Sequence, residues 1–257
     1  MFPFRYLVKC LVHKFSGTAK PEDDNFYSGF YNQVLKIDTT PPGSIEEARA
    51  NLYNNKNLII ANHIGAGSRM KRKNQTVGEM AGTVSISAHH GALLFRMAQH
   101  YKPRKIIEMG TAMGISALYL AAGNPEADIT TVEGNPQLAS LAMENFKNYG
   151  SDRIHLLNKS FEEVIDQLAA EAGTGTLVYI DGNHTCEATL SYYQAFTANK
   201  STDLILIFDD INWSAGMMDA WDHIRKNLSQ GVIIDLFHMG IVFYGNGVEK
   251  KEYKVRY

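Results

Sequence analysis

Five short apolar runs alternate with helical patterns from Lys105 onward, and this alternation limits the possible folds more than any other feature. Each run is rich in β-branched residues and is bounded by polar residues or glycine, as buried strands are. Strands that alternate with helices form right-handed crossovers and hence a parallel sheet. The runs are Ile106–Met109, Ile129–Glu133, Ile154–Leu157, Leu177–Asp181 and Leu204–Asp209, and the helical patterns cover about 115–122, 136–149, 161–170, 185–198 and 214–228.

Two further apolar runs follow, and only His238 and Met239 separate them. Because Val232–Phe237 and Gly240–Tyr244 leave no room for a crossover helix, we expect a hairpin that contains one antiparallel strand. The predicted fold is therefore α/β. It has a seven-stranded, mostly parallel sheet with helices on both faces, a C-terminal hairpin and an N-terminal helical cap.

Residues 1–100 lack the alternation and are predicted to form this cap, whereas residues 101–257 form the domain that carries the site. The cap includes a lid segment, because the glycine-rich run His63–Arg69 and the basic run Lys71–Lys73 offer no amphipathic helix. The basic run is either a solvated face or, over a site, a feature that favours an acidic substrate.

The composition excludes several classes of protein. With 257 residues, of which 45% are hydrophobic and 20% charged, the chain is typical of globular proteins. A formal net charge of −2 gives no general attraction to nucleic acid. Cys10 and Cys186 lie far apart and in no metal-binding spacing, so we predict no disulfide framework and a cytoplasmic location.

The N-terminal stretch is apolar but is interrupted by Arg5, Lys9 and Lys14, so it is too short and too charged to span a membrane. Two interpretations stay open. The stretch is either a helix packed on the body or on a second subunit, or a basic amphipathic helix on a membrane surface. A homodimer contact would use Phe4, Leu7, Leu11 and Phe15.

The segment Glu108–Ser116 directly follows the first strand and opens a helix. Glycine is needed where a strand turns sharply and the backbone approaches a ligand. The dinucleotide fingerprint places a second glycine two residues after the first, against the pyrophosphate. Here Gly110 is followed by Ala112, and the next glycine is Gly114. The loop therefore suits a ligand without a pyrophosphate, such as S-adenosylmethionine.

An acidic residue also ends the second strand: Glu133, which Gly134 follows. A carboxylate at this position of a Rossmann-like sheet accepts hydrogen bonds from ribose hydroxyls. The spacing between Glu133 and the first loop favours a nucleoside site over a solvated charge.

Three carboxylates follow two later strands: Asp181 after one, and Asp209 and Asp210 after the next. Ligands of open α/β sheets bind outside the carboxyl ends of the strands, so these acids should converge there. Converging like charges are unfavourable unless a cation joins them. Oxygen ligands suit Mg²⁺, which would lower the pKa of a bound substrate hydroxyl. In the alternative, one aspartate contacts the cofactor and the others cap helices.

His184 lies three residues after Asp181, in the same loop. A histidine titrates near neutrality and can remove a hydroxyl proton as a general base. It can equally be a helix-start residue that hydrogen-bonds the backbone.

Together these features resemble the S-adenosylmethionine-dependent O-methyltransferases of Rossmann-like fold, over about residues 80–245. The pattern is most similar to the catechol and caffeoyl-CoA type and to bacterial small-molecule enzymes. The resemblance implies that Glu108, Gly110 and Gly114 shape the methionine end of the cofactor site. It also implies that Ser116 binds the cofactor carboxylate. The implied cofactor-binding residues are Glu108, Gly110, Thr111, Gly114, Ser116, Glu133, Gly134, Ser160, Phe161 and Asp181.

The same resemblance implies that Glu133 holds the ribose, that Ser160 and Phe161 border the adenine, and that the catalytic residues are His184 and Asp181. The implied metal ligands are Asp181, Asp209 and Asp210, although the family often has asparagine where this chain has Asp210. His184 stands where the catechol enzymes have a lysine base.

The predicted function is thus methylation of a small-molecule hydroxyl, with S-adenosylmethionine and Mg²⁺. Three alternatives stay open: a metal-independent methyltransferase, a non-catalytic module that binds S-adenosylmethionine, and an NAD-linked oxidoreductase. Ala112 and the terminal hairpin argue against the last of these.

Overall fold

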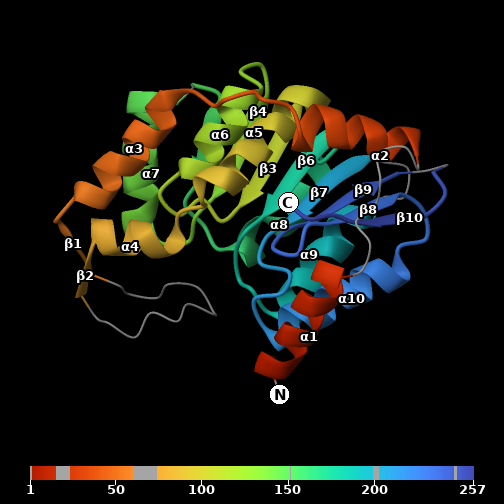
Figure 1. The fold of residues 1–257 in the computed structure, drawn as a ribbon. Coiled ribbons are helices and arrows are strands. Elements are labelled where there is room, and N and C mark those ends of the chain that lie inside the picture. The colour runs from red at the N-terminus through yellow and green to blue at the C-terminus, as the bar shows by residue number, and fades with distance from the viewer. Residues whose placement is uncertain (1, 16–23, 61–73, 151, 199–202, 246–247) are drawn as a thin grey trace. The chain divides into compact units, whose positions relative to one another are not determined.

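The computed structural model describes residues 2–15, 24–60, 74–150, 152–198, 203–245 and 248–257 (Figure 1). Its contacts form two compact units, which we describe separately. The terminal unit comprises Met1–Leu35 and Ile165–Tyr257, and the central unit comprises Lys36–Val164. The boundaries of these two units differ from the domain division that we predicted at residue 100. That division stays a prediction. The predicted lid, His63–Lys73, lies outside the described residues.

The central unit contains three parallel strands, and side chains cap the starts of several of its helices. Thr76 and Glu79 form a capping box for α4, and Ser87 caps α5. The elements are α3 Gly43–Asn54, β1 Leu58–Ile60, β2 Asn74–Thr76, α4 Val77–Val84, α5 Ala88–Tyr101, β3 Lys105–Met109, α6 Ile115–Gly123, β4 Asp128–Val132, α7 Pro136–Tyr149, β5 Ile154–Leu157 and the start of α8 Phe161–Glu171.

The strand register of the central unit brings the ends of its strands together. In the order β3–β4–β5, Met109 pairs with Val132 and Val132 pairs with Leu157. The loops that leave the carboxyl ends of these strands are therefore neighbours. Helix α5 packs against α6, and α3, α6 and α7 contact one another.

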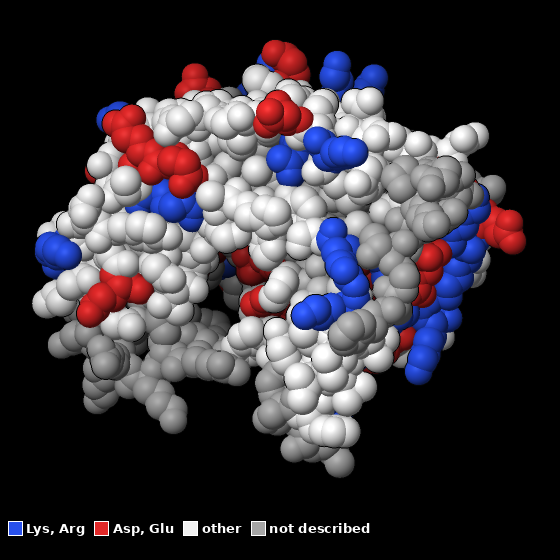
Figure 2. Space-filling view, viewed as in Figure 1, with Lys and Arg blue, Asp and Glu red and all other residues white. Residues whose placement is uncertain are grey.

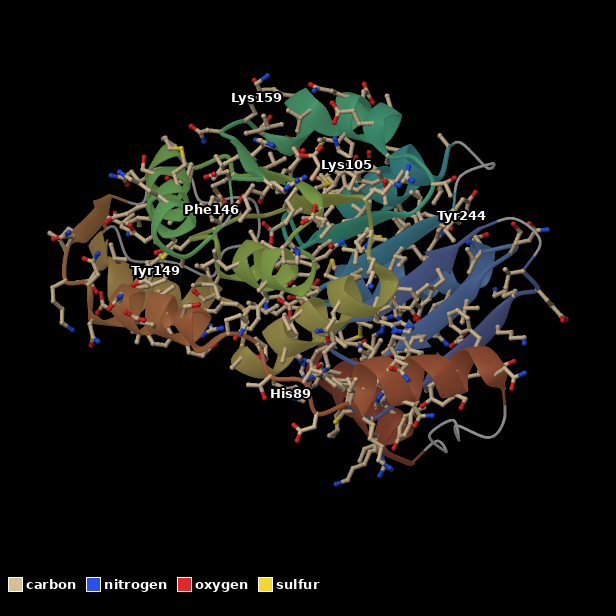
Figure 3. All side chains as sticks on the ribbon, turned by 90° about the horizontal axis from the view of Figure 1, so that it is seen from above. His89, Lys105, Phe146, Tyr149, Lys159 and Tyr244 are labelled. Carbon is tan, nitrogen blue, oxygen red and sulfur yellow. The ribbon has the colours of Figure 1, made fainter. Side chains whose placement is uncertain are left out.

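Gly114 is required where the loop after β3 enters α6. Its φ is +86°, and a Cβ built there would lie 2.5 Å from Cε1 of Phe146 on α7; Figure 3 labels Phe146. An alanine would therefore adopt an unfavourable backbone conformation and would also collide with an aromatic ring.

We expect Gly114→Ala to lower the free energy of unfolding by about 2–4 kcal/mol, because the strain and the overpacking add. Urea denaturation followed by circular dichroism measures this change. Gly82→Ala is the matched control, because Gly82 lies within α4 and a Cβ there meets nothing within 4 Å. That control should gain up to about 1 kcal/mol from helix propensity. Equal stabilities of the two variants would contradict the packing argument.

The terminal unit joins the two ends of the chain, and Figure 1 shows the N-terminal helix α1 beside α10. Its elements are α1 Phe2–Phe15, α2 Asn25–Phe30, the π-helix η2 Tyr31–Leu35, most of α8, β6 Thr176–Ile180, α9 Cys186–Thr197, β7 Leu204–Phe208, α10 Ala215–Asn227, β8 Val232–Asp235, β9 Gly240–Tyr244 and β10 Lys251–Lys254.

The five strands of the terminal unit lie in the order β10–β8–β9–β7–β6. Strand β9 pairs antiparallel with both β7 and β8, whereas β6–β7 and β8–β10 are parallel pairs. The predicted hairpin with one antiparallel strand is therefore confirmed. Because Ile180 pairs with Phe208, the loops after β6 and β7 leave the sheet side by side.

Helices cover both faces of this sheet, as we predicted. Successive side chains of β9 alternate between the two faces. On one face, the ring of Trp221 on α10 closely approaches Gly240, where a Cβ would lie 2.3 Å from the ring. On the other face, Phe26 of α2 contacts Phe243, with ring centroids 5.0 Å apart.

Two features of the described residues go beyond the prediction of a seven-stranded sheet. All seven expected strands are present, and β10 adds an eighth by pairing with β8. Its sequence, Lys251–Lys254, is mostly charged and carries no apolar run, so periodicity did not reveal it. The short pair β1–β2 forms a separate antiparallel hairpin.

Among the described residues, no helix has the length and apolar character needed to cross a membrane. Cys10 and Cys186 are both free thiols, and the cytoplasmic location stays a prediction. The face drawn in Figure 2 carries basic and acidic side chains interspersed, in keeping with the small net charge.

Candidate functional site

The loop between β3 and α6 has an unusual backbone at three positions. Gly110, Ala112 and Gly114 have positive φ angles of 113°, 46° and 86°. The backbone N–H groups of Gly110 and Thr111 both donate to the carbonyl oxygen of Val132, each at 3.1 Å. Two of these positions carry glycine, but Ala112 pays about 1–2 kcal/mol to adopt the left-handed region. The surrounding structure must therefore hold Ala112 in place.

Glu133 holds Ala112 in this conformation. Its Oε2 accepts a hydrogen bond from the Ala112 N–H at 2.9 Å, and its Oε1 accepts one from the Asn135 N–H at 2.8 Å. Burial raises the pKa of Glu133, and these two N–H donors act in the opposite direction. Each carboxylate oxygen has a second lone pair and can accept another hydrogen bond. Glu133 therefore ties the ends of β3 and β4 together and can still accept ligand hydroxyls.

Glu108 lies fully buried on β3 beside this loop. Its Oε2 accepts a hydrogen bond from the Thr131 hydroxyl, which also contacts the Thr111 hydroxyl. Within the described part of the chain, Oε1 of Glu108 has no hydrogen-bond partner of standard geometry. Burial raises the pKa of Glu108 to about 7, although the hydroxyls of Ser116 and Thr131 lower it. A buried carboxylate oxygen without a donor is a candidate partner for a cationic ligand group.

The raised pKa of Glu108 predicts a pH-dependent stability. The Glu108 carboxyl loses its proton near pH 4.5 in the unfolded chain and near pH 7 in the folded one. Between these values the folded state binds more protons, so the free energy of unfolding falls as the pH rises. The free energy of unfolding of the unchanged protein should fall by about 3 kcal/mol across this window, and Glu108→Gln should not show this fall. Urea denaturation from pH 4.5 to 7.5 measures it. Glu144→Gln, an exposed change on α7, should follow the unchanged protein; equal slopes for all three proteins would contradict the prediction.

Asparagines that the sequence reasoning did not select fix the surroundings of the loop. Asn145 on α7 donates from Nδ2 to the Met113 carbonyl at 2.8 Å. Asn158 donates in the same way to the Glu133 carbonyl at 2.6 Å. Asn135 caps α7, and its Nδ2 is buried without a partner among the described residues. Asparagine occurs at many caps and turns, so only its place in the fold reveals these roles.

The other predicted cofactor residues of the central unit occupy mixed environments. Ser116 is buried in the first turn of α6, whose N-cap Gly114 provides no side-chain cap. Gly134 is exposed, and Phe161 is partly exposed at the start of α8. The N–H of Ser160 donates to the Glu163 carboxylate at 2.7 Å, a helix-start contact. The adenine role of Ser160 and Phe161 therefore stays a prediction.

In the terminal unit, a buried tyrosine brings two of the predicted acids together. The Tyr179 hydroxyl on β6 lies 2.8 Å from Oδ2 of Asp209 and 3.2 Å from Oδ2 of Asp181. Burial, followed by the charges of Asp181 and Asp210, raises the pKa of Asp209 well above its usual range. The register of β6 and β7 thus places these acids as neighbours, as the sequence predicted. Tyr179 itself was not selected, because an aromatic residue inside an apolar strand looks like core.

Asp210 adopts a left-handed conformation, with φ 54°, and its N–H donates to Oδ1 of Asp209 at 2.8 Å. Across the described residues, no group of three or more histidine, cysteine, aspartate or glutamate side chains is arranged to hold a metal ion. The carboxylates Asp181, Asp209 and Asp210 have the donor chemistry that Mg²⁺ prefers. Their arrangement does not fit three ligands around one ion.

His184 lies close to one of these acids. Its Nε2 is 3.6 Å from Oδ1 of Asp181, and both side chains are 21% exposed. The imidazole ring also contacts Trp213, with centroids 5.7 Å apart. A carboxylate at this distance orients the ring. Solvent-accessible and oriented, His184 has the properties of a general base.

Comparison with known proteins agrees with these observations. Residues 107–211 match the methyltransferase domain family. The matched stretch holds the loop after β3, Glu133, Asp181, His184 and Asp209. The resemblance inferred from the sequence is therefore confirmed.

Curated relatives match over part of their length. A catechol O-methyltransferase of Mycobacterium tuberculosis is 26% identical over 137 residues, which are 52% of this chain and 60% of that protein. A catechol O-methyltransferase of Niastella koreensis is 27% identical over 103 residues, 39% of this chain and 47% of that protein. The chain thus spans about half the length of the curated relatives it matches.

Solved structures agree with the fold over most of the chain. A SAH-bound Podospora anserina methyltransferase has a TM-score of 0.62 at 16% identity, covering 90% of this chain and 100% of the other. An O-methyltransferase of Bacillus cereus in complex with SAH has a TM-score of 0.57 at 16% identity, covering 82% and 94%. At these identities the likeness concerns the fold, and it confirms the predicted Rossmann-like α/β arrangement.

Proposed function

We propose that this chain is an S-adenosylmethionine-dependent methyltransferase that acts on a hydroxyl group of a small molecule. The observation that carries the proposal is a pair of strand-end carboxylates, the buried Glu108 and the partly buried Glu133, around a loop with three positive φ angles. The names of the curated relatives support the choice of an oxygen acceptor.

The residues of the central unit fit the parts of S-adenosylmethionine. The unpartnered Oε1 of Glu108 offers a negative group for the ammonium of the methionine moiety. Glu133 retains lone pairs for the ribose hydroxyls. The first turn of α6 has no side-chain cap, so its N–H groups and the helix dipole favour the carboxylate. The ammonium, the carboxylate and the ribose hydroxyls of the cofactor would thus each meet a complementary protein group.

When bound, S-adenosylmethionine supplies an electrophilic methyl group on its sulfonium. His184 would remove the proton from the acceptor hydroxyl, and Asp181 would orient the imidazole and stabilise its charged form. Tyr179 would hold Asp181 and Asp209 at their positions. Most of the acceleration of such a displacement comes from alignment of the reacting groups, which is worth about 7–11 kcal/mol.

We derive no step through a metal, because the acids as arranged do not form a three-ligand site. Turnover measured with and without Mg²⁺ distinguishes metal-independent O-methylation from the metal-assisted form. The assignment of Asp181, Asp209 and Asp210 as Mg²⁺ ligands stays a prediction that the same experiment tests.

Calorimetric titration of S-adenosylmethionine into metal-stripped protein, and again with Mg²⁺, tests the proposal. We expect saturable one-site binding in both titrations. If S-adenosylmethionine bound in neither condition, the proposed function would be rejected, and NAD would be the next ligand to test. A dependence of methyl transfer to catechol on added Mg²⁺ would reject the metal-independent form. Binding without transfer to catechol or to a panel of hydroxylated small molecules would favour the non-catalytic module.

A further inference from the structure

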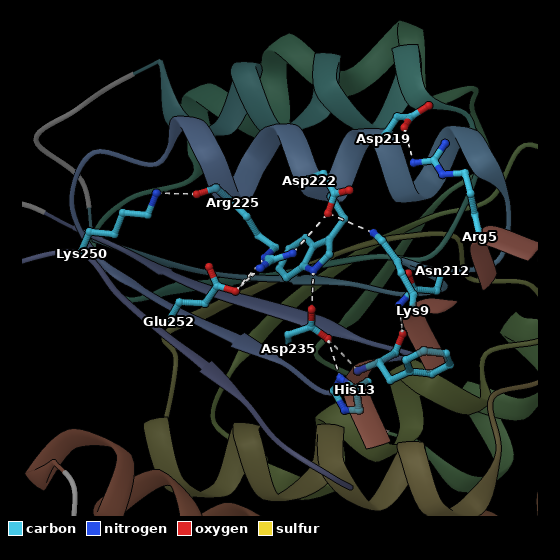
Figure 4. A network of polar contacts seen from close by, with 12 residues as sticks. Arg5, Lys9, His13, Asn212, Asp219, Asp222, Arg225, Asp235, Lys250 and Glu252 are labelled. Carbon is cyan, nitrogen blue, oxygen red and sulfur yellow. Dashed lines mark hydrogen bonds and ion pairs between the residues drawn. The ribbon is translucent and has the colours of Figure 1, made fainter. Parts of the chain in front are cut away.

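Helix α1 contacts α10, in the same terminal unit, through polar side chains. Nη2 of Arg5 lies 2.8 Å from Oδ1 of Asp219, and Nζ of Lys9 lies 3.0 Å from Oδ1 of Asp222, both on α10 (Figure 4). His13 continues the same stripe, because residues four apart share one helix face. Large apolar side chains of the helix are exposed instead: Phe4 by 71%, Leu7 by 54%, Leu11 by 44% and Val12 by 48%.

This arrangement differs from that of a helix retained for stability. Such a helix buries its apolar stripe against the core. Exposed ion pairs contribute little to stability, but they define where a helix lies and in which direction it runs. The contacts of α1 therefore specify its position more than they add to the stability of the unit.

The polar stripe ends at the turn between β8 and β9. Nε2 of His13 lies 3.0 Å from the Val255 carbonyl oxygen, and Nδ1 lies 3.7 Å from Oδ1 of Asp235. The rings of His13 and Tyr6 contact the ring of Phe237, with centroids 5.3 Å and 5.5 Å apart. Two rings of helix α1 thus contact Phe237 in this turn.

Phe237 is held in an unfavourable backbone conformation. Its φ is 72°, and such a value persists in a bulky residue only where neighbours impose it. Asp235 provides one constraint, since its Oδ1 accepts the Phe237 N–H at 2.9 Å and its Oδ2 accepts Nε1 of Trp221 at 3.1 Å. The ring contacts with α1 provide another. The turn is therefore a place where α1 can influence the backbone.

The same turn holds the loop that carries Asp209 and Asp210. The Ile211 N–H donates to the His238 carbonyl at 3.1 Å. Nδ2 of Asn212 donates to the Phe237 carbonyl at 2.7 Å, and the Asn212 side chain is buried. Ile211 and Asn212 directly follow the two acids and are thus hydrogen-bonded to the tip of the turn.

We propose that helix α1 positions the Asp209–Asp210 loop through Phe237, and that Asn212 is the positioning residue that joins the turn to the loop. The role of the loop in methyl transfer rests on the proposed function, but the mechanical connection does not. A segment at the start of the chain would in this way control the geometry of acids some two hundred positions away in sequence.

Hydrogen exchange of the unliganded full chain, read by mass spectrometry over residues 210–213, tests the connection. Exchange reports local opening, and the loss of one constraint changes it about five- to tenfold. We expect this increase in the double variant Tyr6→Ala with His13→Ala, and also in Asn212→Leu. In Asn212→Leu, exchange of residues 4–14 should stay unchanged, because the helix contacts remain.

Matched changes on the same helix provide the controls. Leu7→Ala with Val12→Ala alters exposed side chains and should leave residues 210–213 unchanged. Tyr6→Phe keeps the ring and should behave as the unchanged protein. Residues 108–114 in the central unit serve as the internal reference and should exchange equally in every variant.

Unchanged exchange of residues 210–213 in the Tyr6 and His13 double variant, with faster exchange of residues 4–14, would overturn the proposal. Faster exchange in every segment of the double variant would indicate global destabilisation. The exchange of residues 210–213 in Asn212→Leu and in Tyr6→Phe would then decide whether the proposal holds. Binding of S-adenosylmethionine to the unchanged protein is measured in a separate experiment, by calorimetry. Its failure would reject the proposed function and leave the exchange result valid, whereas a failed exchange test would leave cofactor binding intact.

Discussion

Replacement of His184 by alanine should lower the turnover number for methyl transfer by about 10²–10⁴-fold, the usual contribution of a general base. His184 lies 3.6 Å from Asp181, which can orient the ring and stabilise its protonated form. The affinity for S-adenosylmethionine should change little, because this side chain is assigned to the acceptor hydroxyl. Initial rates with the best acceptor of a hydroxyl panel, and calorimetry of cofactor binding, measure the two quantities.

The control for this prediction is His223→Ala, since His223 lies exposed on α10. It should retain full turnover and full affinity. If His184→Ala lost affinity and turnover together, His184 would be a binding or structural residue. A turnover within about threefold of the unchanged protein would leave proton removal to water.

Replacement of Glu133 by glutamine should weaken S-adenosylmethionine binding by about 30–100-fold. Glutamine keeps the shape of the side chain but places an amide NH₂ opposite one of two backbone donors, Ala112 and Asn135. It also replaces charged hydrogen bonds to the ribose, which are worth about 1.5–3 kcal/mol, with neutral ones. Calorimetry at pH 7.5 measures the affinity.

Two controls separate binding from folding. Glu144→Gln is an exposed change on α7 and should bind as the unchanged protein does. Urea denaturation of Glu133→Gln shows whether the loop change affects the whole fold. An affinity equal to that of the control would remove Glu133 from the cofactor site and leave it a structural tie between β3 and β4.

Most strands and helices of the second half were predictable because apolar periodicity encodes them directly. The run Ile106–Met109 lies within β3, and the runs on either side of His238 form the hairpin β8–β9. Strand β10 was missed because its edge position tolerates lysine and glutamate, which erase the alternation. The packing of α1 was left open, because its sequence suits a helix packed on the body, on a second subunit or on a membrane surface. The structure shows its polar side chains in contact with α10.

The candidate site followed from strand ends and spacing. Glu133, Asp181 and Asp209 end apolar runs and Glu108 lies one residue before the end of its run, and parallel register makes such residues neighbours. Spacing did not indicate what holds them. Tyr179 reads as core from its run, and Asn145 and Asn212 contact the site loops only because distant segments fold against them.

Local patterns along the chain were sufficient to define the element order, the hairpin and the strand-end acids, because period, length and turn residues act over a few positions. The folded structure alone revealed the state of those acids: the burial that raises the pKa of Glu108 and Asp209, and the absence of a three-ligand metal arrangement among the described residues. It alone also connected α1 to Phe237 and Asn212. Burial and hydrogen-bond geometry depend on which distant residues meet, and no short window of sequence contains that information.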